Sequence, residues 1–244
     1  MNTMTALAQL QSILNETYSS EENGEFKIEL KEGLSDDEIH LLAQQLPTRQ
    51  LPAEIHELLR FSSGFKFPPF KEITFDGISL FDMEEFFPYS VKLTTDIFTN
   101  VWIVDVDLQG NWGNVFFISH DPAVIVKHSE NLSQFIQHIH EFGKDKKLSN
   151  LDKIREKTVF DIWEQKDGLI SLEHARQSDD LVLKEFASRL ENNYVIADLR
   201  NKPNKSGFAW GKFGPSIQKT IRNGSNTLWG IERRKGILSK IFNR

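Results

Sequence analysis

Residues 51–142 constrain the fold most, because helix, turn and strand signals follow one another there in a fixed order. The stretch 51–59 opens with Leu-Pro, and proline is favoured at a first helical position, where its missing N–H group costs nothing. Its apolar residues then recur at helical spacing, and Gly64 supplies the left-handed conformation that ends many helices. Residues 101–107 are rich in β-branched and aromatic side chains and predict a strand.

The rest of this region predicts two more strands and a closing helix. Polar residues and glycines at 109–114 indicate a turn, and the short apolar runs 115–118 and 123–126 indicate strands. Residues 135–142 place apolar side chains on one helical face, and this helix can stop at Gly143. An α+β fold is therefore predicted, in which helices cover a sheet and no catalytic signature is attached.

Three segments in this order resemble the SUKH superfamily, the Smi/Knr-type domain found in fungal cell-wall assembly regulators and bacterial toxin-immunity proteins. They are the Leu-Pro helix leading to Gly64, the turn 107–111, and the run 124–128 followed by 133–136. The resemblance covers residues 34–142. It implies a mixed or antiparallel sheet covered by helices, in a non-catalytic protein that binds another protein. In bacteria that partner is typically a toxin, and the alternative role is regulation of cell-wall or envelope assembly.

Charge divides the chain into two parts. Residues 1–150 hold 11 Lys and Arg against 23 Asp and Glu, whereas residues 151–244 hold 18 against 12, so the parts carry −12 and +6. Such an asymmetry favours two regions with different surfaces. We predict a SUKH-like domain at 1–143 and a smaller, basic α+β domain at 151–244. The acidic first part suits a basic partner, such as a nuclease toxin.

Composition and motifs limit the functional classes. Cysteine is absent, which rules out disulfides and thiolate sites and suits a reducing cytoplasm. No apolar run reaches the ~20 residues of a membrane span, and residues 1–7 lack the features of a secretory signal. The phosphate-binding, dinucleotide-binding and hydrolase glycine motifs are missing as well. We therefore expect a cytoplasmic protein with no catalytic residue and no cofactor.

Two clusters imitate metal sites. The string at 105–110 begins like a calcium loop, but the twelfth position, which needs a bidentate carboxylate, is Phe116. A hairpin turn with solvated carboxylates is the better interpretation, and an enzyme that uses Asp105 and Asp107 is the alternative from another class. Four histidines lie close together in the sequence, without the i, i+4 spacing of a helical zinc site, so we predict surface histidines and no metal. They are His120, His128, His138 and His140.

The candidate partner-binding residues fall into two groups. Phe65, Phe67 and Phe70 flank two consecutive prolines, which prevent a regular strand, so we predict a loop that can expose one of them as an anchor. A loop folded back on the sheet is the favoured interpretation, because large exposed apolar patches are uncommon on monomers. The second group surrounds the predicted turn and comprises Asp105, Asp107, Asn111 and Trp112.

The basic C-terminal stretch leaves several interpretations open. Residues 201–244 carry ten Lys and Arg against the single acid Glu232, with aromatic residues between them. The stretch docks on the acidic first part, forms a solvated face, or binds nucleic acid by stacking and phosphate contacts. Nucleic acid is disfavoured, because the overall charge is negative. An amphipathic, membrane-surface helix at 233–242 is a further alternative.

Overall fold

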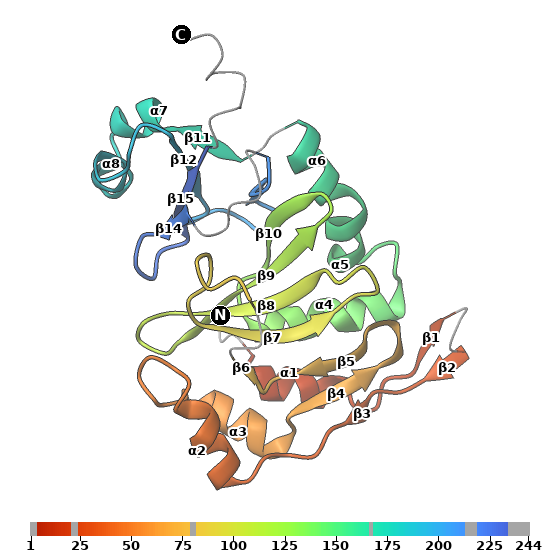
Figure 1. Cartoon of the computed structure of the whole chain (residues 1–244). Helices are drawn as coiled ribbons and strands as arrows, with labels where there is room; N and C mark the ends of the chain where they lie inside the picture. Colours follow the sequence, from red (N-terminus) through yellow and green to blue (C-terminus); the bar gives the residue numbers. More distant parts are fainter. Residues whose placement is uncertain (1–3, 21–23, 79–81, 166–167, 213–218, 234–244) are drawn as a thin grey trace.

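The computed structural model describes residues 4–20, 24–78, 82–165, 168–212 and 219–233. Every strand pairing in these ranges is antiparallel, and helices lie against the sheets, which confirms the predicted α+β class (Figure 1). None of the helices in these ranges has the length and apolarity that a membrane crossing requires. The amphipathic helix predicted at 233–242 falls on residues 234–244, outside the described ranges.

The first third of the chain alternates short helices with two small sheets. Its elements are α1 (Ala6–Ile13), β1 (Tyr18–Ser20), β2 (Gly24–Phe26), β3 (Glu29–Leu30), α2 (Asp36–Ala43), α3 (Ala53–Phe61), β4 (Gly64–Phe67), a 3-10 turn (Pro68–Phe70) and β5 (Lys71–Thr74). β1 pairs with β2, and β3, β4 and β5 form a three-stranded sheet. The helix predicted at 51–59 is present as α3, but it starts at Ala53, so Pro52 is its N-cap residue rather than its first helical position.

The central third builds the main sheet and the helix behind it. Its elements are β6 (Gly77–Ile78), β7 (Ser90–Thr95), β8 (Val101–Val106), β9 (Trp112–His120), β10 (Ala123–Ser129) and α4 (Leu132–Lys144). The order in this sheet is β13-β10-β9-β8-β7-β6. All six residues of β8 are buried, since Trp102 and Val104 belong to the core cluster that includes α4, while Ile103 belongs to a second cluster on the other side.

The last third begins with helices that pack in the first core cluster and ends with a sheet that packs in the second one. Its elements are α5 (Asn150–Lys153), a π-helical turn (Ile154–Thr158), α6 (Val159–Glu164), β11 (Leu169–Ser171), α7 (Leu172–Arg176), α8 (Leu181–Ser188), β12 (Tyr194–Asp198), β13 (Gly207–Phe208), β14 (Thr220–Arg222) and β15 (Leu228–Glu232). β11, β12, β15 and β14 form a four-stranded sheet in that order. β13 joins the main sheet by pairing with β10.

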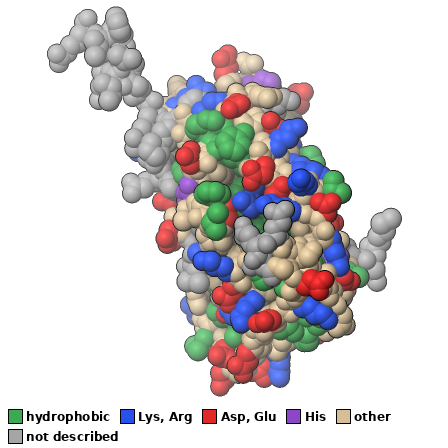
Figure 2. Space-filling model, turned by 90° about the vertical axis from the view of Figure 1, so that its right-hand side faces the viewer, with side chains coloured by type: hydrophobic (Ala, Val, Ile, Leu, Met, Phe, Trp, Pro, Cys, Tyr) green, Lys and Arg blue, Asp and Glu red, His purple; other side chains and the backbone are tan. Residues whose placement is uncertain are grey.

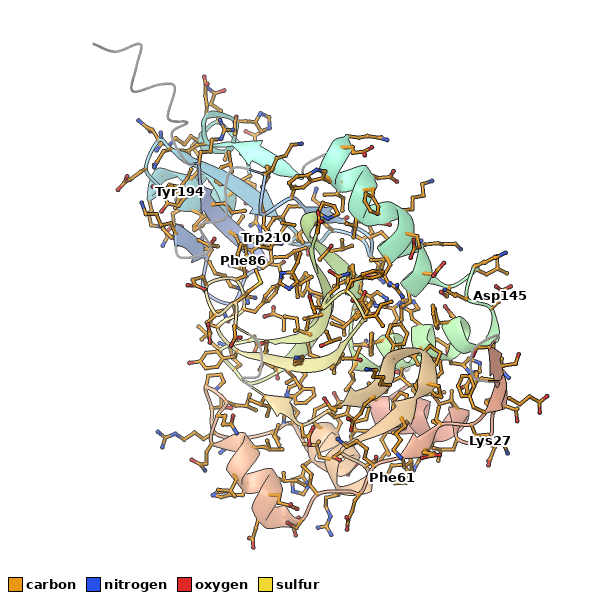
Figure 3. The ribbon with its side chains drawn as sticks, turned by 45° about the vertical axis from the view of Figure 1, so that its right-hand side comes forward. Lys27, Phe61, Phe86, Asp145, Tyr194 and Trp210 are labelled. Atoms are coloured by element: carbon orange, nitrogen blue, oxygen red, sulfur yellow. The ribbon has the colours of Figure 1, made fainter. Side chains whose placement is uncertain are left out.

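The ranges 1–143 and 151–244 share two core clusters, whereas a further cluster lies wholly within residues 172–228. Phe86, Ile103 and Phe116 pack in one cluster with Phe208 and Trp229 from the C-terminal part. Figure 3 shows Phe86 beside Trp210 at this junction, and the ring centroids lie 6.2 Å apart. The basic C-terminal part is therefore docked on the first part, mainly through apolar side chains, each of which contributes a few kcal/mol when buried.

The predicted phenylalanine anchor is wrong. Phe65 and Phe67 belong to β4, Phe70 belongs to the 3-10 turn, and all three side chains are buried. The prolines Pro68 and Pro69 do not create a projecting loop, because they form the tight connection between the paired strands β4 and β5. The rings of Phe67 and Phe70 stack on each other, which confirms the favoured interpretation of a segment folded back on the core.

The prediction of surface histidines is wrong for two of the four. His128 on β10 and His138 on α4 are buried, and the Ser129 hydroxyl lies 2.7 Å from His128 Nδ1 and 3.1 Å from His138 Nδ1. Asn150 Nδ2 lies 3.3 Å from the other ring nitrogen of His138. Because burial penalises the charged form, the pKa of His128 lies well below 6.5, and burial also lowers the pKa of His138.

These two histidines predict a loss of stability at mildly acidic pH. Above pH 6.5, the ordinary histidine pKa, His128 is neutral in both the folded and the unfolded chain, so it does not reduce the free energy of unfolding. Below pH 6.5 the unfolded chain takes up a proton that folded His128 does not, so stability falls by up to about 1.4 kcal/mol per pH unit. Urea unfolding at about pH 7.5 and pH 5.5 measures this loss. Both pH values lie above the ordinary titration range of carboxylates, so carboxylate protonation contributes little to the difference.

The variant His128→Gln should lose less stability between these two pH values than the unmodified chain. His174 is exposed on α7 and provides the matched control, since His174→Gln should leave the pH dependence as it is. An unchanged pH dependence in His128→Gln would show that the buried pair is not its source.

Candidate protein-binding edge

A buried ion pair joins the main sheet to the C-terminal sheet. Arg222 at the end of β14 donates two hydrogen bonds to Asp105 on β8, from Nη1 to Oδ1 at 2.7 Å and from Nη2 to Oδ2 at 2.6 Å. The side chains of Arg222 and Asp105 are only 4% and 8% exposed. A planar guanidinium facing a carboxylate in this way is a strong and directional contact.

The remaining donors of Arg222 hold three backbone carbonyls in two segments. Nε donates to the carbonyl of Asn226 at 3.0 Å, Nη2 to that of Ser225 at 3.1 Å, and Nη1 to that of Phe86 at 3.3 Å. The guanidinium also lies over the ring of Trp229, whose Nε1 donates to the same Phe86 carbonyl at 2.8 Å. Arg222 therefore sets the position of the β14–β15 hairpin against the main sheet.

Burial and the ion pair act in opposite directions on Asp105. Burial raises the pKa of this carboxyl group, whereas the positive charge and the hydrogen bonds of Arg222 lower it. Without Arg222 the carboxylate would be buried with no cation beside it, which is costly. Asp105 is thus a structural residue rather than a surface contact for a partner.

The turn at 107–111 is held by the side chain of its own first residue. Asp107 Oδ1 accepts from the backbone N–H groups of Gln109 at 2.8 Å and Asn111 at 2.9 Å, and Oδ2 accepts from Asn111 Nδ2 at 3.0 Å. Gly110 adopts a positive φ of 82°, which glycine takes without strain. The hairpin turn is present as predicted, but its carboxylates are not solvated, since both oxygens of Asp107 are engaged within the turn and Asp105 is buried.

Three loops that are distant in sequence meet beside this turn. The N–H group of Leu108 donates to Ser225 Oγ at 2.9 Å, and a Cβ on Gly110 would lie 2.5 Å from Thr48 Oγ1. Figure 1 shows the loops one above another at the left edge of the molecule. We call residues 44–52, 107–111 and 223–227 the three-loop edge.

The exposed side chains of the three-loop edge mix polar and apolar character. Leu108 is 50% exposed, and Arg49, with a φ of 53°, projects from the first loop. Other exposed residues of the edge include Thr48, Gln50, Gln109, Asn111 and Asn226. Such a surface has the hydrogen-bonding groups and the apolar centre that protein interfaces combine.

The predicted site residues divide between the edge and the interior. Asn111 is exposed at the three-loop edge and Asp107 lies there half-buried, while Trp112 begins β9 and its Nε1 is buried without a partner. Asp105 lies behind the edge. Thr48, Gln50 and Ser225 were not among the candidates, because the turn residues around them carry no local sign that the fold brings them to 107–111.

The carboxylates proposed for an enzymatic alternative have structural partners. Asp105 is bonded to Arg222 and Asp107 to its own turn. Among the described residues, no group of three or more His, Asp or Glu side chains is arranged to hold a metal ion.

No family model matches this chain, and no match was found among curated proteins or among solved structures. The resemblance to the SUKH superfamily therefore rests on the sequence segments at 51–64, 107–111 and 124–136 alone.

Breaking the buried ion pair should destabilise the protein. The variant Arg222→Met leaves Asp105 buried without its cation, and we expect the free energy of unfolding to fall by about 3–5 kcal/mol. Chemical denaturation followed by tryptophan fluorescence measures the loss. Lys66 pairs with Glu29 at the surface, and Lys66→Met is the control that should change stability little. Equal, small effects of both variants would contradict the structural role of Arg222.

Proposed function

We propose that this protein is a non-catalytic binding module that uses the three-loop edge to bind another protein, and that it acts as an immunity protein against a toxin. The observation that carries the binding role is the meeting of three loops from distant parts of the chain at one edge of a packed scaffold. Loops fixed by a rigid scaffold are where binding residues concentrate. The toxin as partner follows from the resemblance to the SUKH superfamily.

The edge is preorganised, which supports a binding role. Asp107 fixes the central turn from within, and Arg222 fixes the hairpin that carries Ser225. The contact between Leu108 and Ser225 then joins the two loops. A surface that is already ordered spends less conformational entropy on association, so that more of the contact energy appears as affinity.

Charge supports a basic partner. Residues 1–150 carry a net charge of −12. Asp36, Asp37 and Glu38 are exposed in the first turn of α2, whose C-terminal end leads into the loop 44–52. Figure 2 shows Asp and Glu side chains gathered at the lower end of the molecule, where Figure 1 places α2. Complementary charge of this kind accelerates encounter with a basic toxin such as a nuclease.

Absence of cysteine suits a reducing compartment, and we place the protein in the cytoplasm, where a toxin that reaches its target would be neutralised. Regulation of envelope assembly through the same edge is the alternative that the resemblance allows. The two roles are distinguished by the protein that binds to the edge, which is a toxin in the first case and an envelope-assembly protein in the second.

Leu108→Arg tests the proposed interface. The full-length chain serves as bait in an extract of the native cells, and mass spectrometry identifies the proteins that it retains. Leu108 is half exposed, so the variant should fold normally and yet lose the partner by more than about tenfold, because it places a bulky positive charge at the centre of the contact.

The control for this experiment is Leu181→Arg. Leu181 is 78% exposed at the start of α8 and lies outside the three-loop edge, so this variant should retain the partner. Equal retention by both variants would place the contact elsewhere. With the partner in hand, its association rate should fall steeply as salt is added, and a rate indifferent to salt would contradict the electrostatic part.

A further inference from the structure

The turn between β7 and β8 exposes two adjacent large apolar side chains. Ile97 is 80% exposed, the highest value for a large apolar side chain in the described part of the chain, and Phe98 is 66% exposed. This turn lies at the end of β8 opposite to the three-loop edge, because β8 runs from residue 101 to residue 106 between the two turns. The exposed pair is therefore separate from the proposed partner-binding surface.

Asp96 accepts hydrogen bonds from three backbone N–H groups of this turn. Asp96 Oδ1 accepts from the N–H groups of Phe98 at 2.9 Å and Asn100 at 3.0 Å, and the N–H group of Thr99 donates to the Asp96 carbonyl at 3.1 Å. The Asp96 side chain is 3% exposed, and its Oδ2 lies 3.5 Å from Arg155 Nε. A tip whose amides and carboxylate are already partnered enters a low-dielectric environment at reduced cost.

The neighbouring segment 144–157 contacts this turn through Arg155 and carries exposed lysines. Arg155, which contacts Asp96, has exposed Lys153 and Lys157 two residues away on either side. The turn that precedes α5 adds exposed Lys146 and Lys147. Lys153 Nζ donates to the carbonyl of Leu148 at 2.6 Å, and this bond connects the turn to the helix that carries Lys153.

The segment 144–157 is basic as a whole and carries further exposed apolar residues. It holds six Lys and Arg against the three acids Asp145, Asp152 and Glu156. Asp145 Oδ1 is engaged by the backbone N–H of Lys147, and Glu156 lies 3.8 Å from Arg155. Leu148 and, further on, Phe160 are exposed. Figure 2, which views this side of the molecule, shows hydrophobic side chains in the upper half with both basic and acidic side chains among them.

We propose that this face binds an anionic lipid surface, with Ile97 and Phe98 inserted at the boundary between headgroups and acyl chains and with the lysines of 144–157 against lipid phosphates. An apolar tip beside several exposed lysines matches the two contributions to peripheral membrane binding, apolar burial and attraction to negative headgroups. The segment 144–157 is positively charged and an anionic lipid surface is negatively charged, which is why we choose this ligand.

A lipid surface fits this face better than an acidic protein does. The apolar part is a narrow tip of two residues, whereas a protein partner needs a broad complementary patch. The lysines of 144–157 are exposed at several positions along the segment, which suits a diffuse layer of negative charge more than a set of paired contacts. The cytoplasmic leaflet, which is anionic, presents such a layer.

Vesicle binding by the full-length chain tests the proposal. The probes are phosphatidylcholine vesicles with and without roughly one third phosphatidylserine, at low salt and at about 0.5 M salt. We expect binding to the anionic vesicles alone and release by salt. The double variant Ile97→Ser/Phe98→Ser and the double variant Lys146→Glu/Lys147→Glu should each reduce the partition coefficient about tenfold or more.

Two controls distinguish this face from the proposed protein-binding edge. Leu108→Ser changes the tip of an equivalent turn at the other end of β8, and Leu181→Ser changes an apolar residue that is exposed on α8. Both should bind vesicles as the unmodified chain does, and Leu108→Arg should lose its protein partner while it keeps vesicle binding.

Several results would overturn the lipid proposal. These are no binding to anionic vesicles, equal binding to neutral ones, or an equal loss in Leu108→Ser. Loss of a protein partner instead of vesicle binding in Ile97→Ser/Phe98→Ser would overturn it too, and would identify a protein contact. All substituted side chains are exposed, so near-UV circular dichroism should be unchanged in every variant.

Discussion

The buried pair of Asp105 and Arg222 is the contact on which the arrangement of the two halves depends. A carboxylate on the fully buried strand β8 must have a cation beside it, and the cation comes from the far end of the chain. The same guanidinium then holds the backbone carbonyls of Phe86, Ser225 and Asn226. Apolar packing brings the C-terminal sheet to the main sheet, but this directional pair fixes its position.

Local signals in the sequence predicted the order of elements well, and long-range contacts poorly. The start of α3 after Pro52 and the strand at 101–107 are properties of a few neighbouring residues. The pairing of β13 with β10 and the bond from Arg222 to Asp105 join residues about eighty and 117 positions apart, and no local pattern records them. The charge difference between residues 1–150 and 151–244 is a general sign of two regions, but it does not identify the apolar side chains through which they pack.

The wrong predictions share a physical cause, since each treated a residue type as a guide to exposure. Two consecutive prolines predict a loop, yet Pro68 and Pro69 belong to a 3-10 turn, and the phenylalanines on either side of them are buried. Histidines without a metal spacing were placed at the surface, yet Ser129 satisfies both His128 and His138 on one side. Burial is decided by the partners that the fold supplies, and these were invisible in the sequence.

The two turns at the ends of β8 show how stability and surface chemistry are separated in this protein. Asp96 and Asp107 make the same set of bonds, to the N–H groups two and four residues later and to the side chain of the asparagine that closes each turn. The fourth residue has a positive φ in both, 65° at Thr99 and 82° at Gly110.

The side-chain hydrogen bonds of each turn come from its first and last residues. The side chains of the second and third residues are therefore not needed to hold the turn together. One turn displays Ile97 and Phe98 beside lysines, and the other displays Leu108 and Gln109 beside two further loops. The scaffold can therefore present two different surfaces through one turn design. A change at either tip should alter binding without altering the fold.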